Sequence, residues 1–135
     1  MRSYLTPPPP HHLILASQSP RRKQLLVDAG ISLHQIAAAD IDETPDNAEL
    51  PVPYALRMAQ KKAEVIAATS SGQFVLAADT VVACGRRILP KAETPEQAAA
   101  CLDVLSGRAH RVYGGICLCL PDGQMRTRLS VSQVK

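Results

Sequence analysis

The chain has 135 residues, 46% of them hydrophobic, which is enough for one domain with one core but too few for a second full domain. Lys and Arg outnumber Asp and Glu by 15 to 12, and the resulting formal charge of +3 is too small to indicate a dedicated nucleic-acid-binding protein. Aromatic residues make up only 3% of the chain, which argues against the stacked-aromatic surfaces of single-strand binders.

The first part of the chain predicts a leader, a strand and a helix. Residues 1–12 contain four consecutive prolines, which lack backbone donors and fix φ, so we expect a leader outside the fold. Residues 13–16 form a short apolar run typical of a buried strand. From Pro20 the apolar pattern becomes helical, and Gly30 is placed to end this helix.

The middle of the chain predicts three further strands and a long helix. Residues 31–39 indicate a second strand, and residues 40–53 are acidic and interrupted by proline, as is typical of an active-site loop. Residues 54–68 are apolar at helical spacing and predict an amphipathic helix. Residues 74–83 form the strongest buried strand, and a turn with a short return strand follows at residues 84–89.

The last part predicts a helix and a hairpin. Residues 94–97 combine an N-cap hydroxyl, a proline at the first helical position and a Gln three residues on, which predicts a helix to about Leu105. Residues 111–120 and 125–134 predict an antiparallel hairpin. Strands and helices together indicate an α/β or α+β fold with a mixed sheet.

The cysteines and the apolar segments indicate a reducing, aqueous compartment. Cys84, Cys101, Cys117 and Cys119 form no CxxC pair, so we interpret them as reduced core thiols. No apolar run approaches the roughly 18 residues of a membrane span, and residues 1–12 lack the apolar segment of a secretory signal. We therefore expect a cytoplasmic protein whose partners include neither a membrane nor nucleic acid.

Residues 17–22, with the sequence Ser-Gln-Ser-Pro-Arg-Arg, have the composition of an anion-binding turn. Backbone N–H groups at a helix N-terminus and the helix dipole favour an anion there. The hydroxyls of Ser17 and Ser19 and the guanidiniums of Arg21 and Arg22 add donors with phosphate geometry. Alternatively, Ser19 only caps the helix and the arginines are solvated, and the local sequence leaves both interpretations open.

Asp79 interrupts the strongest apolar strand. A buried carboxylate is costly unless it is paired, hydrogen-bonded or bound to a metal. Asp79, Glu43 and a phosphate oxygen together would hold Mg²⁺, and Asp79 could orient or deprotonate the attacking water. Alternatively, Asp79 is a structural residue that backbone donors satisfy at a strand bulge.

Two lysines and a glycine turn complete the candidates. Lys62 and Lys91 are each an ordinary surface lysine by themselves, but near bound phosphates each would neutralise charge on the leaving pyrophosphate. Residues 106–110, Ser-Gly-Arg-Ala-His, are best interpreted as a helix C-cap with Gly107 in the left-handed region. His110 is a secondary candidate.

The same segments resemble the Maf family of nucleotide pyrophosphatases. Five motifs match the family in order: residues 13–22, 42–43, 57–63, 78–82 and 106–112. An ordered set of this kind is far more specific than any one motif, and the resemblance extends over residues 13–120.

The resemblance implies a homodimer with an α/β fold, in which helices flank a mixed, elongated sheet around a central cleft, similar to the inosine triphosphate pyrophosphatases. It implies Mg²⁺- or Mn²⁺-dependent hydrolysis of a nucleoside triphosphate to the monophosphate and pyrophosphate, which cleans the nucleotide pool. Asp79 would be the catalytic proton acceptor and, with Glu43, a metal ligand. The substrate would be bound by Ser17, Ser19, Arg21, Arg22, Lys62, Thr80 and Lys91. Arg21 and Thr80 match the family branch that acts on dTTP and UTP.

The chain departs from the family pattern in several places. Lys91 lies between Pro90 and Ala92 where the family has Gly and Pro, Gly114 replaces a Thr, and the proline leader is additional. Family members continue with a strand-and-helix segment that completes the sheet and supplies a substrate-discriminating Gln. We therefore expect a C-terminally shortened domain at residues 13–135.

Two other functions remain open. The first is a catalytically silent protein that binds nucleotides or regulates cell division at septum formation. The second is a small basic nucleic-acid module, which the low net charge and the few aromatic residues disfavour.

Overall fold

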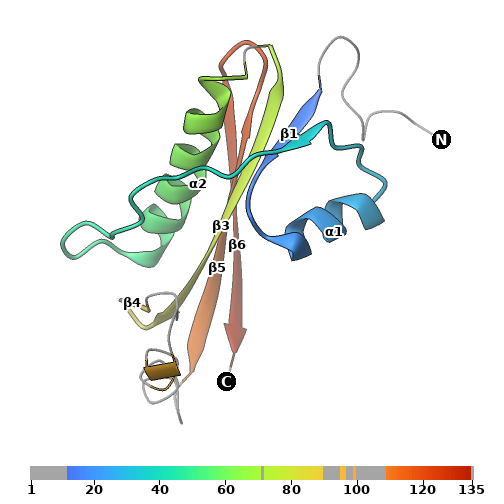
Figure 1. Cartoon of the computed structure of the whole chain (residues 1–135). Helices are drawn as coiled ribbons and strands as arrows, with labels where there is room; N and C mark the ends of the chain where they lie inside the picture. The colour runs from blue at the N-terminus through green and yellow to red at the C-terminus, as the bar shows by residue number, and fades with distance from the viewer. Residues whose placement is uncertain (1–11, 71, 90–94, 97–98, 100–108, 135) are drawn as a thin grey trace.

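The computed structural model describes residues 12–70, 72–89, 95–96, 99 and 109–134. These residues form a mixed sheet with a helix on either side (Figure 1). Residues 1–11 of the predicted leader lie outside the described residues. Its last residue, His12, is part of the fold rather than outside it, because its carbonyl accepts the N–H of Phe74 at 2.8 Å. Of the helix predicted at residues 94–105, the structure describes only Pro95, Glu96 and Ala99, and all three are helical.

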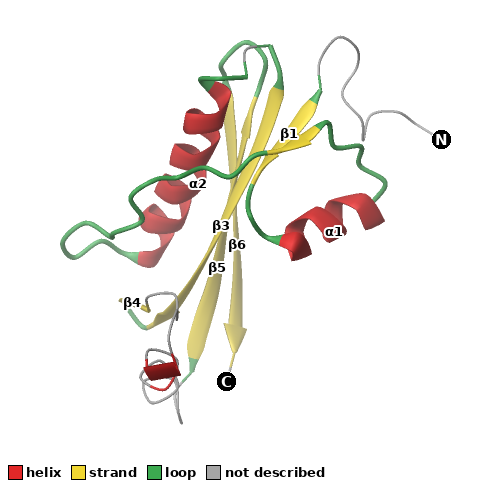
Figure 2. Ribbon diagram, in the orientation of Figure 1, coloured by secondary structure: helices red, strands yellow, loops and turns green. Residues whose placement is uncertain are grey.

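The sheet is arranged around the strand that the sequence predicts as the most buried. Its strands are β1 (Leu13–Ala16), β2 (Gln35–Ile36), β3 (Phe74–Cys84), β4 (Arg87–Leu89), β5 (His110–Cys119) and β6 (Met125–Val134). β1 is parallel to both of its neighbours, β2 and β3. β3 is antiparallel to β4 and β5, and β5 is antiparallel to β6. The strand order within the described residues is β2-β1-β3-β5-β6, with β4 also on β3, so the predicted mixed sheet is confirmed (Figure 2).

The strand predicted at residues 31–39 is wrong in extent, because only Gln35 and Ile36 are extended and paired. Both paired residues are exposed, whereas Ala37 and Ala39 beyond them pack partly buried against the core without belonging to the strand. Its partner β1 is only four residues long, which limits the ladder further. The predicted hairpin of β5 and β6 is confirmed.

One face of the sheet is covered by α2 (Pro51–Ala67), the predicted long helix. It begins three residues earlier than predicted, because Pro51 fits the first turn, where no N–H partner is needed. Its buried residues are Pro51, Tyr54, Ala55, Met58, Ala59, Ala63 and Ile66. They pack into two apolar clusters, one around Val75 and Ala77 of β3 and one around Val81 and Ala83. Asp79 lies on β3 between the two clusters.

The helix α2 approaches the sheet most closely at Gly115 of β5. A Cβ atom at this position would lie 2.4 Å from the carbonyl oxygen of Ala55 and 2.7 Å from its carbonyl carbon. A glycine in a strand interior often marks such an approach of another backbone segment. Gly115 is paired with Asp79 in the sheet, so the helix is closest to the sheet beside this carboxylate.

The other face of the sheet is accompanied by α1 (Pro20–Asp28). This helix ends at Ala29 and Gly30, whose φ of +82° confirms the predicted stop. All of its residues are described and none is buried; Leu25 is 62% exposed. None of the helices that the described residues form is long and apolar enough to cross a membrane.

Candidate active site

The turn between β1 and α1 holds the first group of predicted site residues. Ser19 caps α1, because its Oγ accepts a hydrogen bond from the N–H of Arg22 at 3.3 Å. The Oγ of buried Ser17 accepts from the N–H of Ser19 at 3.1 Å and from Nη1 of Arg22 at 3.3 Å. Ser19 therefore caps the helix, and its role in substrate binding stays a prediction, whereas Arg22 is folded back onto the turn. The guanidinium and the helix N-terminus give this turn its positive character.

Arg22 also joins this turn to the central strand. Its Nη2 donates a hydrogen bond to Oγ1 of Thr80 at 3.0 Å. Thr80 follows Asp79 on β3. The Arg22 guanidinium therefore contacts both Ser17 on the turn and the residue next to Asp79 on the strand. The turn and the strand that carries Asp79 are thus in direct contact.

Asp79 is only 1% exposed, and it forms an ion pair with Lys62 of α2. Nζ of Lys62 lies 2.8 Å from Oδ1 of Asp79 and 3.3 Å from Oε1 of Glu43. The side chain of Lys62 is 12% exposed, so it is not the surface lysine that its sequence alone suggests. The bulge alternative for Asp79 is wrong, since the register with β5 is continuous over residues 75–83, all of them described.

The loop that precedes α2 comprises residues 40–50, and we call it the acidic loop. A hollow of about 620 Å³ lies between this loop and the β1–α1 turn. This volume is within the range of small-molecule sites. The residues that line it are Ala16, Ser17, Gln18, Ser19, Arg22, Ala39, Asp40, Ile41, Glu43 and Lys62. Asp79 is not among the described residues that line it and is reached through Lys62. Donors for an anion and carboxylates for a cation thus share one hollow.

The donor set fits a hard divalent cation that the substrate helps to bind. Carboxylate oxygens of Glu43 and Asp79 both approach one ammonium group, so they converge on a common point. Oxygen ligands of this kind suit Mg²⁺ or Mn²⁺. The described residues contain no group of three or more His, Cys, Asp or Glu side chains that could hold a metal ion. Two carboxylates suffice for Mg²⁺ when phosphate oxygens and waters complete the coordination.

Four further candidates are not among the described residues that line this hollow. Arg21 is exposed on α1 and does not line the hollow, so its phosphate-binding role stays a prediction. Lys91 and the glycine turn at residues 106–108 lie outside the described residues. His110 lines a different hollow of about 530 Å³, beside the N-terminus of α2.

Tyr54 and Gly115 were not predicted from the sequence. Gln18 and Asp40, which line the hollow, lie in segments predicted to belong to the site but were not singled out. The hydroxyl of Tyr54 donates a hydrogen bond to the carbonyl of Glu43, and burial together with the charges of Asp79 and Glu43 raises the pKa of this phenol. Gly115 had a signal in the sequence, because a glycine inside an apolar strand suggests close backbone approach. Tyr54 had none, since its partner is a backbone carbonyl in a loop.

Solved structures share this fold at low sequence identity. A nucleoside-triphosphatase described as a dITP/XTP pyrophosphatase from Mycobacterium abscessus superimposes with a TM-score of 0.55 at 16% identity, covering 90% of this chain and 70% of its own. The Ham1 protein of Staphylococcus aureus gives a TM-score of 0.54 at 14% identity, covering 90% and 69%. These similarities support the α/β architecture with a central sheet flanked by helices.

The chain is also similar in sequence to proteins named dTTP/UTP pyrophosphatase. The one from Paramagnetospirillum magneticum is 56% identical over 120 residues, which is 89% of this chain and 63% of the relative. The one from Mesorhizobium japonicum is 58% identical over 127 residues, or 90% and 61%. The chain thus spans about three fifths of the length of these relatives. The family model described as Maf-like protein matches residues 12–135. The chain belongs to the Maf family.

Proposed function

We propose that this protein is a nucleoside triphosphate pyrophosphatase that hydrolyses dTTP and UTP to the monophosphate and pyrophosphate. One observation carries this proposal: a single hollow places the Ser17–Arg22 hydrogen bond beside the Lys62 ammonium that joins Glu43 to Asp79. The names of the relatives supply the substrate class. The reaction fits the task of removing nucleotides from the cellular pool.

In this proposal the β1–α1 turn binds the triphosphate. Arg22 and the N–H groups at the start of α1 offer donors to phosphate oxygens at the positive end of a helix. The hydrogen bond from Arg22 to Thr80 fixes the direction of the guanidinium. Thr80 therefore acts on the substrate by orienting Arg22.

Glu43 and Asp79 would hold Mg²⁺ or Mn²⁺ together with phosphate oxygens, and the cation would neutralise phosphate charge and acidify a bound water. Lys62 now occupies the point on which both carboxylates converge. It would turn toward the leaving pyrophosphate once the carboxylates have another cationic partner. Asp79 would then accept the proton of the attacking water at a carboxylate oxygen.

The remaining parts of the proposal rest on the sequence. Arg21 and Thr80 match the family branch for dTTP and UTP, and Lys91 would bind the leaving phosphates. A homodimeric state, a cytoplasmic location and the lack of nucleic-acid partners are further predictions of the sequence analysis.

Pyrophosphate release from a panel of triphosphates with Mg²⁺ or Mn²⁺ tests the proposal. We expect dTTP and UTP to be cleaved, and Asp79→Asn to reduce kcat by roughly 100-fold or more, as loss of a general base does. Asn keeps the shape of Asp and an acceptor for Lys62, so the fold should persist. Folded protein that cleaves no triphosphate would refute the proposal, and binding without cleavage would instead support the silent nucleotide-binding alternative.

A further inference from the structure

The acidic loop carries Glu43 to the candidate active site without regular secondary structure. Its own hydrogen bonds are local: the N–H of Thr44 donates to the carboxylate of Asp42 at 3.0 Å, and the N–H of Glu49 donates to the carbonyl of Asp46 at 3.0 Å. Ala48 has a φ of +58°, which a non-glycine residue adopts only when surrounding contacts hold it. A segment of this kind needs attachment to a rigid element to hold one position.

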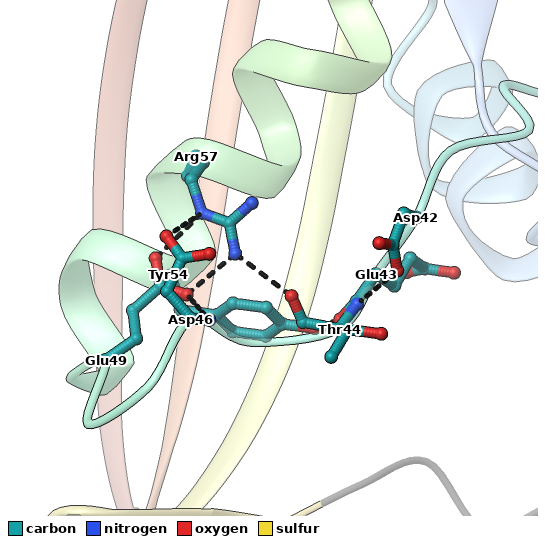
Figure 3. Close-up of polar contacts among 7 residues, drawn as sticks. All are labelled: Asp42, Glu43, Thr44, Asp46, Glu49, Tyr54 and Arg57. Carbon is teal, nitrogen blue, oxygen red and sulfur yellow. Dashed lines mark hydrogen bonds and ion pairs between the residues drawn. The ribbon is translucent and has the colours of Figure 1, made fainter.

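Arg57 of α2 provides one attachment (Figure 3). Its guanidinium binds the carboxylate of Glu49 at two points, with Nε at 2.8 Å and Nη2 at 2.7 Å, and Nη2 lies 3.3 Å from the carbonyl oxygen of Thr44. Asp46 adds a longer ion pair of 3.7 Å. Glu49 is only 8% exposed, and the same carboxylate accepts the N–H of Asp46 at 2.9 Å. Two-point binding fixes direction as well as distance.

Tyr54 provides the second attachment from the same helix. Its hydroxyl donates to the carbonyl of Glu43, and the Arg57 guanidinium lies 5.6 Å from the centre of its ring. Tyr54 and Arg57 are three residues apart, so they lie on one face of α2. The two attachments therefore hold adjacent carbonyls, those of Glu43 and Thr44.

The Glu43 side chain is not held firmly by its ion pair alone. It is 43% exposed, and its Oε1 lies 3.3 Å from Lys62. An ion pair with one half-exposed partner holds that side chain only in part, because solvent screens it on the exposed side and side-chain entropy opposes it. The backbone of residues 43–44 must therefore be fixed by other contacts for Glu43 to face Lys62 and Asp79.

We propose that Arg57 is a positioning residue for the reaction: it braces the acidic loop through Glu49 and Thr44 and so sets the place of Glu43. This inference rests on the proposed function. It adds a residue to that function, Arg57, which is not among the described residues that line the hollow. Arg57 is the first residue of the matched segment at residues 57–63, and the sequence assigned it no role. The Glu49 pKa is lowered, chiefly by its hydrogen bonds to Arg57, so the brace is charged at neutral pH.

Hydrogen exchange of the substrate-free chain tests the brace itself. We expect Arg57→Met to speed amide exchange at Thr44 and Asp46 by roughly fivefold or more, because local opening becomes easier. Arg57→Lys should give an intermediate effect, since it keeps the charge but loses the two-point geometry. Lys61→Met, an exposed change on the same helix, is the matched control and should leave this exchange unchanged. Loop exchange that is equal in Arg57→Met and wild type would overturn the proposal.

A double-mutant cycle tests whether Arg57 acts through Glu43. Arg57→Met should lower kcat/KM by roughly tenfold or more, as loss of a supporting contact does. In a Glu43→Gln background the same change should cost less than about twofold, because the group that it positions is already gone. Losses that simply multiply would show that Arg57 acts independently of Glu43 and would overturn the proposal.

The two experiments separate this inference from the proposed function. A wild-type chain that neither binds nor cleaves triphosphates would refute the function, while the exchange measurement would still show whether Arg57 holds the loop. If the wild-type chain is active and the losses of kcat/KM in Arg57→Met and Glu43→Gln simply multiply in the double mutant, only the positioning role of Arg57 is refuted. Tyr54→Phe removes only a hydroxyl and gives a milder second variant, which should speed exchange at Thr44 without loss of the helix face.

Discussion

Replacing Gly115 by Ala should force α2 away from the sheet. A Cβ atom there would lie 2.4 Å from the Ala55 carbonyl oxygen, about 1 Å inside an ordinary contact of roughly 3.4 Å. The obstacle is helix backbone, which cannot rotate aside as a side chain can. Overpacking costs about 1–3 kcal/mol, and a backbone clash belongs at the upper end, near 3 kcal/mol.

Urea unfolding of Gly115→Ala and Gly114→Ala measures this effect. With an m-value of about 2 kcal/mol/M, a loss of about 3 kcal/mol lowers the urea midpoint by about 1.5 M. Gly114 is the matched control: it is the preceding residue on the same strand, and an added Cβ would meet nothing closer than Ser130 at 3.8 Å. Its substitution should change the free energy of unfolding by less than about 0.5 kcal/mol.

The same variant links packing to the site. A shift of α2 by about 1 Å would lengthen the 2.8 Å contact between Lys62 and Asp79 beyond hydrogen-bond distance. Triphosphate turnover should therefore fall in Gly115→Ala and persist in Gly114→Ala. Equal midpoints for the two alanine variants would refute the reasoning about close helix approach.

Three further changes test the charges of the site. Lys62→Met should lower the free energy of unfolding by about 3 kcal/mol in urea titrations, because it removes the ammonium group that lies 2.8 Å from buried Asp79, whereas exposed Lys61→Met should not. Arg22→Gln should weaken binding of a non-hydrolysable triphosphate by about tenfold or more in calorimetry, the size expected for a charged hydrogen bond, and an unchanged Kd would contradict its role. The lowered Glu49 pKa gives stability that is present above the ordinary glutamate pKa of 4.5 and lost as pH falls through the folded value. The stability advantage of wild type over Glu49→Gln should thus shrink in acid unfolding below pH 4.5, and a constant difference would argue against the ion pair.

The local patterns of the sequence predicted most elements of the fold. The apolar run at residues 74–83, the proline-led helix at Pro20 and the hairpin of β5 and β6 each depend on neighbours in sequence, so they could be recognised without the tertiary structure. The strand at residues 31–39 failed because its length depends on the length of its partner β1 and on burial, which no local pattern contains.

The site was predictable in its residues but not in its contacts. The burial of Lys62 did have a signal, since it lies in the i, i+4 row of Tyr54, Met58 and Ile66 on the buried face of α2. The bridge from Lys62 to both Glu43 and Asp79 joins a loop, a helix and a strand, and no spacing along the chain predicts it. The same reason explains why the attachment of Tyr54 to the Glu43 carbonyl was missed.

A structure of the chain with Mg²⁺ and dTTP in which a methylene group replaces the oxygen between the α and β phosphates tests the central claim most directly. The account predicts phosphate oxygens within hydrogen-bond distance of Arg22 and the Ser17–Ser19 turn, with the cation between those oxygens and the carboxylates of Glu43 and Asp79. Lys62 should then contact phosphate. Phosphates bound elsewhere, with Lys62 still shared between the two carboxylates, would contradict the account.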